Sequence, residues 1–398
     1  MEKIRRKLHY FDFYLFLPYI ALCLFGAVMV YSSSSINLSY AGITTNFYLE
    51  RQLLYVFLGL VCLSLTTFLN LSKLTSRSFI IGGFFVMAAL LAYAKFMTKA
   101  VNGANGWINL KFFSLQPAEL CKLYLILFVA QLFARREQFL LENAVTTYRN
   151  WRPWLLVIIL LLMILIEPDL GGFAINVTIV VIMALANTAS YKSLKQSFSW
   201  FAVLTTMIIL LLSLLRYWNP LAKTNYNYMY SRLAAFYDPF KAASSSGQQL
   251  INSYYAISNG GIFGLGLGNS IQKRGYLPEP YTDFILAVTS EELGAIGVAI
   301  IIGLIAWLTL RVFLIGIRET NTYASLLCYG IGTFFAVETF FNLGAVTGLL
   351  PITGVTFPFV SYGGSSMLVL SLALGIVMNI SIHQKRLKKL GQANRFDF

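Results

Sequence analysis

Long apolar runs constrain this chain more than any other feature. Runs of about 18 residues or more recur along its 398 residues, and each could cross the hydrocarbon core of a bilayer as a helix. Hydrophobic residues make up 58% of the chain and charged residues 12%, with a mean hydropathy of +0.69. A membrane barrel would show ~10-residue segments of alternating polarity instead. The sequence therefore predicts an all-α, polytopic membrane protein.

The apolar runs predict about ten transmembrane helices in one integral membrane domain over residues 1–398. A large extracellular loop over residues 217–282 would be the longest connection, and no soluble module is expected. The expected spans are residues 12–33, 53–70, 78–94, 117–134, 154–168, 171–189, 198–217, 283–310, 323–345 and 359–382.

Basic residues predict how the spans are oriented. With the N-terminus inside, 19 of the 30 Lys and Arg fall in inner segments, which is the usual bias of cytoplasmic loops. We therefore expect both termini in the cytoplasm. Basic loops that face anionic lipid account for most of the net charge of +14, so this charge does not imply a nucleic-acid partner.

One carboxylate, Asp283, stands where a polar loop meets a long apolar helix. On the expected orientation it lies at the outer lipid–water boundary, where it could act on a molecule with a wet head and a lipid tail. The alternative is that Thr282 or Asp283 only caps the helix. The loop before it is rich in glycine, which indicates tight turns close to a ligand or to another chain segment: Gly260, Gly261, Gly264, Gly266 and Gly268.

Other acidic residues also lie in or beside the spans, where ionisable groups are costly and are functional suspects. Glu119 and Lys122 stand three residues apart, so they share a helix face and are expected to pair, either for packing or for function. Asp169 is expected to cap the sixth span. Glu291 and Glu292 lie about two turns inside the eighth span, and one of them is expected to face the bundle interior in a buried, paired role.

Several segments resemble the SEDS family (shape, elongation, division and sporulation proteins), which includes FtsW, RodA and SpoVE. Their order and spacing over nearly the whole chain carry the resemblance. They are Val101-Asn-Gly-Ala-Asn-Gly-Trp-Ile108, Gln116-Pro-Ala-Glu-Leu-Cys-Lys122, Glu167-Pro-Asp-Leu-Gly171, Gly247-Gln-Gln249 with Ser253, Asn259-Gly-Gly261 through Asp283, Gly348-Leu-Leu-Pro-Ile-Thr-Gly354 and Pro358-Phe-Val-Ser-Tyr-Gly-Gly-Ser-Ser366.

The resemblance implies a glycosyltransferase that polymerises lipid II into peptidoglycan glycan strands. Its essential aspartate matches Asp283, and its Gln-Pro-x-Glu…Lys motif matches Glu119 and Lys122. An inverting displacement needs a base on the attacking 4-hydroxyl and charge neutralisation on the leaving diphosphate. Asp283 is the candidate base, and Lys122, Lys273 and Arg274 are candidate diphosphate partners. The full set of substrate-contact candidates is Glu119, Lys122, Lys273, Arg274, Gln249, Ser253 and Ser361.

Two positions depart from the pattern of the family. Tyr281 stands where many members have His before Thr-Asp, which suggests that this residue shapes the site rather than carrying protons. Gly106 stands where many have Arg or Ser before Trp, so a phosphate contact there is not expected. The segments Gly354-Val-Thr-Phe-Pro-Phe359 and Asn269-Ser-Ile-Gln-Lys-Arg-Gly275 look closer to FtsW of low-GC Gram-positive bacteria than to RodA.

The resemblance also implies partners and a cofactor. The partners are lipid II, undecaprenyl-diphosphate-linked glycan, a class B penicillin-binding protein that acts as a transpeptidase, and other divisome proteins, at the bacterial cytoplasmic membrane. A divalent cation, Mg²⁺ or Mn²⁺, would be shared with the substrate diphosphate. No organic cofactor is expected. The four cysteines lie in expected spans without a Cys-x-x-Cys motif, so no metal cluster of the protein is expected.

Three other functions remain open at this point. A transporter that flips lipid II would also use polar residues in the membrane and a helix broken near Pro168, but no repeated halves are visible. A RodA-type glycosyltransferase of cell elongation would share the chemistry and differ in its role. A non-catalytic scaffold for a transpeptidase is compatible with either.

Overall fold

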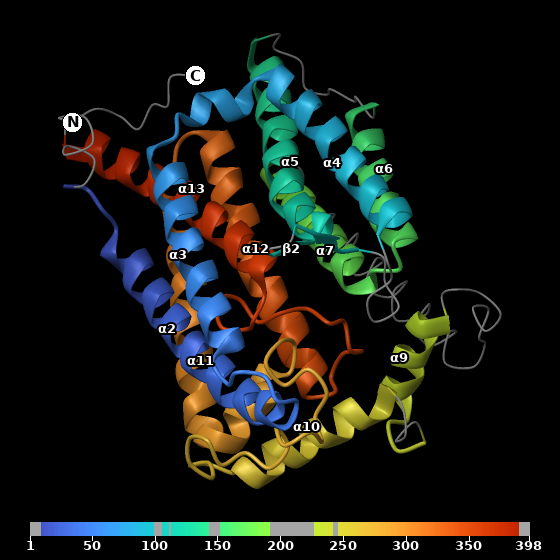
Figure 1. The fold of residues 1–398 in the computed structure, drawn as a ribbon. Coiled ribbons are helices and arrows are strands. Elements are labelled where there is room, and N and C mark those ends of the chain that lie inside the picture. The colour runs from blue at the N-terminus through green and yellow to red at the C-terminus, as the bar shows by residue number, and fades with distance from the viewer. Residues whose placement is uncertain are drawn as a thin grey trace.

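The computed structural model describes residues 9–98, 106–110, 113–142, 152–191, 227–241 and 246–389. Its long helices run side by side as a bundle, and nine of the ten expected spans coincide with one of them (Figure 1). Seven are long and apolar enough to cross a membrane. The remaining expected span, 198–217, lies outside the described residues. The long helices are α2 (Phe13–Tyr40), α3 (Phe47–Phe68), α4 (Arg77–Met97), α5 (Pro117–Glu142), α6 (Arg152–Ile166), α7 (Leu170–Tyr191), α11 (Ile285–Ile317), α12 (Thr322–Val346) and α13 (Gly364–Lys389).

Several helices extend beyond the apolar runs that predicted them. The first continues to Tyr40 through a run of four consecutive serines. The hydroxyls of Ser33 and Ser34 donate to carbonyls one turn back, at 2.7 Å each, so these polar groups are satisfied inside the helix. The last begins at Gly364, five residues later than expected. Hydropathy therefore located the helices, while polar satisfaction and turns set their ends.

The connections hold shorter elements. The described part of the loop predicted over 217–282 contains two helices, α9 (Asn227–Tyr237) and α10 (Ser246–Gly260). A 3-10 helix, η1 (Leu71–Thr75), precedes α4. Strands β1 (Ile108–Asn109) and β2 (Ser114–Leu115) pair antiparallel and lead into α5.

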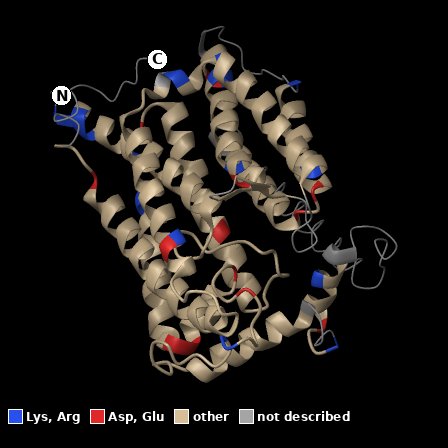
Figure 2. Cartoon of the chain, in the orientation of Figure 1, with Lys and Arg blue, Asp and Glu red and all other residues tan. Residues whose placement is uncertain are grey.

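One end of the bundle is basic. There α2 begins, α5 and α13 end, and Lys and Arg gather in the helix termini (Figure 2). We call it the basic end. Asp12 caps α2 here, and its buried carboxylate binds Arg311 at 2.8 Å and Lys385 at 3.2 Å. Because Arg311 belongs to α11 and Lys385 to α13, this one carboxylate joins three helices.

Near the opposite end, α11 is broken. At Gly294 the backbone leaves helical geometry, with φ 67° and ψ −171°. The break frees two carbonyls before it, and the segment 261–275, which we call the glycine loop, supplies their donors. The amides of Leu265 and Gly266 each donate at 2.9 Å to the carbonyls of Glu291 and Glu292.

The glycine loop also accepts from the amides on the other side of the break. The Ala295 amide donates to the carbonyl of Gly261 at 2.9 Å, and the Ile296 amide donates to that of Ile262 at 3.3 Å. In a membrane, backbone groups freed by a helix break must find partners in the protein. These four bonds, which we call the clasp, satisfy that requirement at the break.

Glycine is needed on both sides of the clasp. A Cβ at Gly294 would lie 2.2 Å from the carbonyl oxygen of Ile262, and one at Gly264, where φ is +80°, would lie 2.2 Å from that of Glu292. The glycine cluster had predicted a close approach either to a ligand or to another chain segment. In the described structure the approach is to a chain segment, the backbone of α11.

Gly294→Ala should therefore destabilise the fold by about 2 kcal/mol or more, because a residue with a side chain at positive φ costs ~1–2 kcal/mol before any overlap with Ile262 is counted. The measurement is thermal unfolding of the detergent-solubilised chain. Gly303→Ala in the same helix is the control, since a Cβ there meets nothing within 4 Å. Equal unfolding temperatures for the two variants would contradict the clasp.

Candidate active site

A cavity of about 560 Å³ opens beside the start of α11. Its walls come from the hairpin before α5, the turn between α6 and α7, helices α9 and α10, and the segments around 280 and 352–366. Chain segments far apart in the sequence therefore meet around it. The polar and charged side chains that line it include Gln116, Glu119, Asp169, Arg232, Gln249, Glu279, Thr282 and Asp283.

Asp283 is held in this wall by its backbone. Its carbonyl accepts from the Asn342 side chain at 2.8 Å, and the same amide donates to the carbonyl of Val355 at 2.7 Å. The amide of Tyr362 donates to the carbonyl of Tyr281 at 2.9 Å. The loop before α11 is thus bound to α12 and to the 352–366 segment. Hydrogen bonds to the backbone hold Asp283 in place, and its carboxylate is not used for this purpose.

The alternative role for this residue was a helix cap. The structure places the N-cap of α11 at Phe284, and no side chain makes a cap hydrogen bond there. Asp283 instead accepts from the hydroxyl of its neighbour Thr282 at 3.1 Å and lines the cavity. Asp283 therefore does not cap α11 and lines the cavity instead.

The surroundings make Asp283 a better proton acceptor than an ordinary aspartate. Burial raises the pKa of Asp283 to about 6, against the opposing effects of the Arg232 charge and the Thr282 hydroxyl; Glu279 raises it further. A carboxylate with a pKa near 6 is still ionised at pH 7 and is matched to general-base work there.

Glu119 and Lys122 form the expected pair, with the ammonium 2.7 Å from the Glu119 carboxylate. The sequence did not indicate the third member, Glu338 of α12, which also binds the Lys122 ammonium. Lys122 and Glu338 are fully buried, whereas Glu119 lines the cavity. The Lys122 ammonium therefore neutralises two carboxylates and joins Glu119 in the cavity wall to Glu338 of α12.

Asp169 caps α7, as expected: its carboxylate accepts from the amide of Gly172 at 2.7 Å. Its second carboxylate oxygen accepts from the side-chain amide of Gln116 at 2.9 Å, and the backbone N–H of Gln116 donates to the Ser365 hydroxyl at 3.0 Å. The cap is therefore also part of the cavity wall, where it joins α7 to the start of α5.

Glu167 lies beside this cap, at the start of the family-like segment Glu167-Pro-Asp-Leu-Gly171. It is fully buried, and neither carboxyl oxygen has a hydrogen-bond partner among the described residues. Burial and the neighbouring Asp169 raise the pKa of Glu167 to about 8, while Lys95 lowers it. A Cβ on Gly106 would lie 3.7 Å from this carboxyl group, so the acid stands just behind the cavity wall.

Tyr281 belongs to an aromatic cluster at the cavity edge. Its ring stacks on Tyr48 with 4.3 Å between centroids, and its hydroxyl donates to that of Tyr48 at 3.0 Å. Tyr362 packs edge-on against Tyr48 and lines the cavity. The position therefore shapes the loop that carries Asp283.

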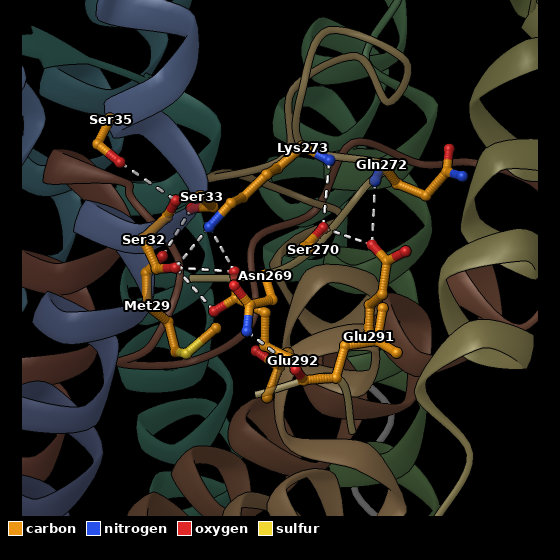
Figure 3. A network of polar contacts seen from close by, with 12 residues as sticks. Met29, Ser32, Ser33, Ser35, Asn269, Ser270, Gln272, Lys273, Glu291 and Glu292 are labelled. Carbon is orange, nitrogen blue, oxygen red and sulfur yellow. Dashed lines mark hydrogen bonds and ion pairs between the residues drawn. The ribbon is translucent and has the colours of Figure 1, made fainter. Parts of the chain in front are cut away.

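Lys273 lies away from the cavity lining, in a buried network across the glycine loop (Figure 3). Its ammonium binds the carboxylate of Glu292 at 2.6 Å and donates to the Ser32 hydroxyl at 3.0 Å. Beside it, Glu291 accepts from the hydroxyl of Ser270 and from the Gln272 amide at 3.1 Å. Both glutamates are thus buried, although only one was expected to face the interior. Glu292 forms the ion pair, Glu291 accepts hydrogen bonds, and both side chains reinforce the clasp.

The other candidates divide between the cavity and its surroundings. Gln249 lines the cavity, whereas Arg274 is exposed and is absent from the lining. The Ser253 hydroxyl is buried and donates to the carbonyl of Val346 at 2.7 Å. The Ser361 hydroxyl accepts from the Phe357 amide at 2.9 Å. The serines therefore hold the backbone near the site.

The basic residue of the cavity wall that the sequence did not indicate is Arg232 of α9. It is the only Lys or Arg among the described residues that line the cavity. Its Nη1 donates to the carbonyl of Ile352 at 3.2 Å. The sequence offered no signal for it beyond a basic residue in a tyrosine-rich loop, because the approach of α9 to the cavity is set by tertiary packing.

Comparison with known proteins identifies the family of this chain. The family model of the cell cycle proteins FtsW, RodA and SpoVE matches residues 13–386. The chain belongs to this family. It is 39% identical to the probable peptidoglycan glycosyltransferase FtsW of Bacillus subtilis, over 96% of this chain and 93% of that one. It is 35% identical to that of Enterococcus hirae, over 93% and 92%, and 33% identical to the stage V sporulation protein E of Bacillus subtilis, over 94% and 98%. The resemblance drawn from the motifs is confirmed.

Solved structures share the SEDS fold. A chain of a peptidoglycan synthase complex, described for its coordination of polymerisation and crosslinking, aligns with a TM-score of 0.71 at 24% identity, over 94% of this chain and 98% of that one. The rod shape determining protein RodA of Thermus thermophilus aligns with a TM-score of 0.62 at 22% identity, over 93% and 96%. These likenesses confirm the polytopic helical architecture.

Lys122→Met should destabilise the chain by about 3–5 kcal/mol, because it leaves two carboxylates in the membrane without their cation. Glu119→Gln should cost much less, since it keeps the pair with Glu338. Adding both Glu119→Gln and Glu338→Gln to the Lys122 variant should recover part of the loss. Thermal unfolding in detergent measures all four proteins, and strictly additive losses would count against the shared cation.

Proposed function

We propose that this chain is a peptidoglycan glycosyltransferase that polymerises lipid II into glycan strands during cell division. The observation that carries the proposal is Asp283, a carboxylate with a raised pKa in a cavity at the start of a membrane helix. Relatives at 35–39% identity over more than nine-tenths of the chain are named probable peptidoglycan glycosyltransferases, which supports this reading of the cavity.

The proposed reaction is an inverting displacement. The 4-hydroxyl oxygen of lipid II attacks the anomeric carbon of the growing glycan, the bond from that carbon to the diphosphate breaks, and undecaprenyl diphosphate leaves. Asp283 accepts the hydroxyl proton. Its pKa of about 6 leaves it ionised before the reaction and able to hold a proton during it.

The proposed orientation places the cavity at the outer face of the cytoplasmic membrane and both termini in the cytoplasm. It is supported by the basic end, where Lys and Arg gather in the last turn of α13 and the C-terminal part of α5 (Figure 2). Asp283 and Arg311 belong to opposite ends of the α11 region, so a basic end inside puts Asp283 outside.

A divalent cation enters the proposal only as a ligand shared with the substrate. The oxygens of Asp283 and Glu279 line the cavity and suit a hard cation such as Mg²⁺ or Mn²⁺. The described residues contain no group of three metal-ligating side chains. When bound, the cation would neutralise charge on the diphosphate, and the protein would contribute part of its coordination.

Asp283→Asn should lower the rate at which the purified chain or its complex polymerises labelled lipid II by about 10²–10⁴-fold, because the amide cannot accept the proton. Asp238→Asn, an exposed carboxylate after α9, is the matched control and should keep full activity. Near-normal turnover of the Asp283 variant would remove it from the mechanism. Movement of lipid II across liposomes without polymer would favour the flippase instead.

The pH profile tests the same assignment. A base with a pKa of about 6 loses its function as it is protonated, so wild-type kcat/KM should fall as pH falls through about 6. Arg232 lowers the pKa of Asp283 and Glu279 raises it, so substitution of either residue should shift the pH at which the acidic limb falls. A rate that is constant from pH 7 to pH 5 would contradict the assignment.

The proposed partner is a single-span class B penicillin-binding protein that crosslinks the new strands. Support comes from an apolar face of α11 whose exposed residues are spaced by seven, three, four and three positions. They are Ile300, Trp307, Leu310, Leu314 and Ile317, all 42–65% exposed. The peptidoglycan synthase complex that aligns with this chain is described as coordinating polymerisation and crosslinking. Helix α12 is mostly buried, so α11 is the better candidate surface.

Photocrosslinkers placed along 298–312 of α11 should capture the transpeptidase in cells, and those at exposed positions should do so more strongly than those at buried ones such as Ile301 and Ile305. Positions along 326–340 of α12 should capture it only near Phe340, which is 61% exposed. Capture from the exposed face of α4 with none from α11 would show that the partner binds elsewhere.

A further inference from the structure

The charges that line the cavity pose a problem for a substrate that carries a diphosphate. Four carboxylates, those of Glu119, Asp169, Glu279 and Asp283, line its wall. A diphosphate entering such a wall meets like charges, which disfavour binding unless a cation faces it. The binding site therefore needs at least one positive group on the cavity surface.

The three basic residues expected to supply this charge do not line the cavity. Lys122 is 1% exposed and binds Glu119 and Glu338, and Lys273 is 1% exposed and binds Glu292. Both ammonium groups already neutralise buried carboxylates. Arg274 is exposed on the glycine loop, outside the lining. Among the described residues, Arg232 is the cation that the cavity surface presents.

Arg232 is also held in place. The bond from Nη1 to the carbonyl of Ile352, at 3.2 Å, fixes its head on the 352–354 turn. A Cβ at Gly354, where φ is +72°, would lie 3.2 Å from Nη1, so this turn passes close beneath the guanidinium. A guanidinium carries five N–H donors in a rigid fork that matches phosphate oxygens.

We propose that Arg232 binds the diphosphate of the lipid-linked glycan that is displaced in the reaction. The proposal rests on the proposed function and assigns the donor side of the same cavity. In the displacement, the bond from the anomeric carbon to the diphosphate oxygen breaks and the electron pair stays with the diphosphate. Arg232 faces the charge that develops there, while Asp283 takes the proton from the attacking hydroxyl.

The position of Arg232 beside Asp283 fits both roles. Both side chains line the same cavity, and the Arg232 charge lowers the pKa of Asp283 against the effect of burial. Loss of Arg232 should therefore also move the acidic limb of the pH profile to higher pH. A residue that served only to support the fold would not shift this limb in one direction.

The test measures binding of undecaprenyl diphosphate and of uncharged undecaprenol to the full chain in nanodiscs. Arg232→Gln should weaken binding of undecaprenyl diphosphate by about 10- to 100-fold and leave binding of undecaprenol unchanged. Arg232→Lys, which keeps the charge and loses the fork, should fall between. Lys241→Gln, an exposed lysine just after α9, is the matched control and should bind as the wild type does.

Asp283→Asn separates this proposal from the proposed function. In buffer without divalent cations, it should bind undecaprenyl diphosphate at least as tightly as the wild type, whatever its effect on polymerisation. Unchanged diphosphate binding by Arg232→Gln would overturn the assignment. So would an equal loss of diphosphate and undecaprenol binding in both Arg232 variants, because that pattern would indicate a collapsed cavity rather than a lost charge contact.

Discussion

The break in α11 at Gly294 is the constraint on which the site depends. An unbroken helix of 33 residues would be ~50 Å long, well beyond the ~30 Å hydrocarbon core of a bilayer. The break separates a short first segment, which follows Asp283, from the part that spans. The clasp then satisfies the backbone groups that the break exposes. The position of the candidate base is thus fixed by backbone geometry. Gly264 and Gly294 are required because no side chain fits between the glycine loop and α11.

Buried charge is the second organising principle. In the described bundle Lys122, Lys273 and Asp12 are each fully or almost fully buried, and each binds groups of opposite charge on other segments. Such ions are costly in a membrane unless they are paired, so their cost is offset by joining helices that are distant in sequence. A cation that is used in this way has little charge left for substrate. The proposed chemistry is therefore assigned to residues on the cavity surface, Arg232 and Asp283.

The fold could be predicted from the sequence because the bilayer sets the length of each apolar run. The pairing of Glu119 with Lys122 followed from helix periodicity alone, and the cap role of Asp169 from its place after Pro168. Long-range partners could not be predicted. Glu338 reaches Lys122 across 216 residues, and nothing in its local sequence points there.

Lys273 and Arg274 show most clearly where local reasoning ends. They are adjacent, both are basic, and both follow the same glycine-rich stretch, yet one is 1% exposed inside the bundle and the other is on the surface. The direction of Lys273 is set by Glu292, on the far side of the clasp, and by Ser32 of α2. Because this ion pair and the four backbone bonds join the glycine loop to both sides of the break, a displacement of α11 by a bound partner would carry the loop with it. A partner on the exposed face of α11 could thus favour one placement of Asp283 over another without touching the cavity.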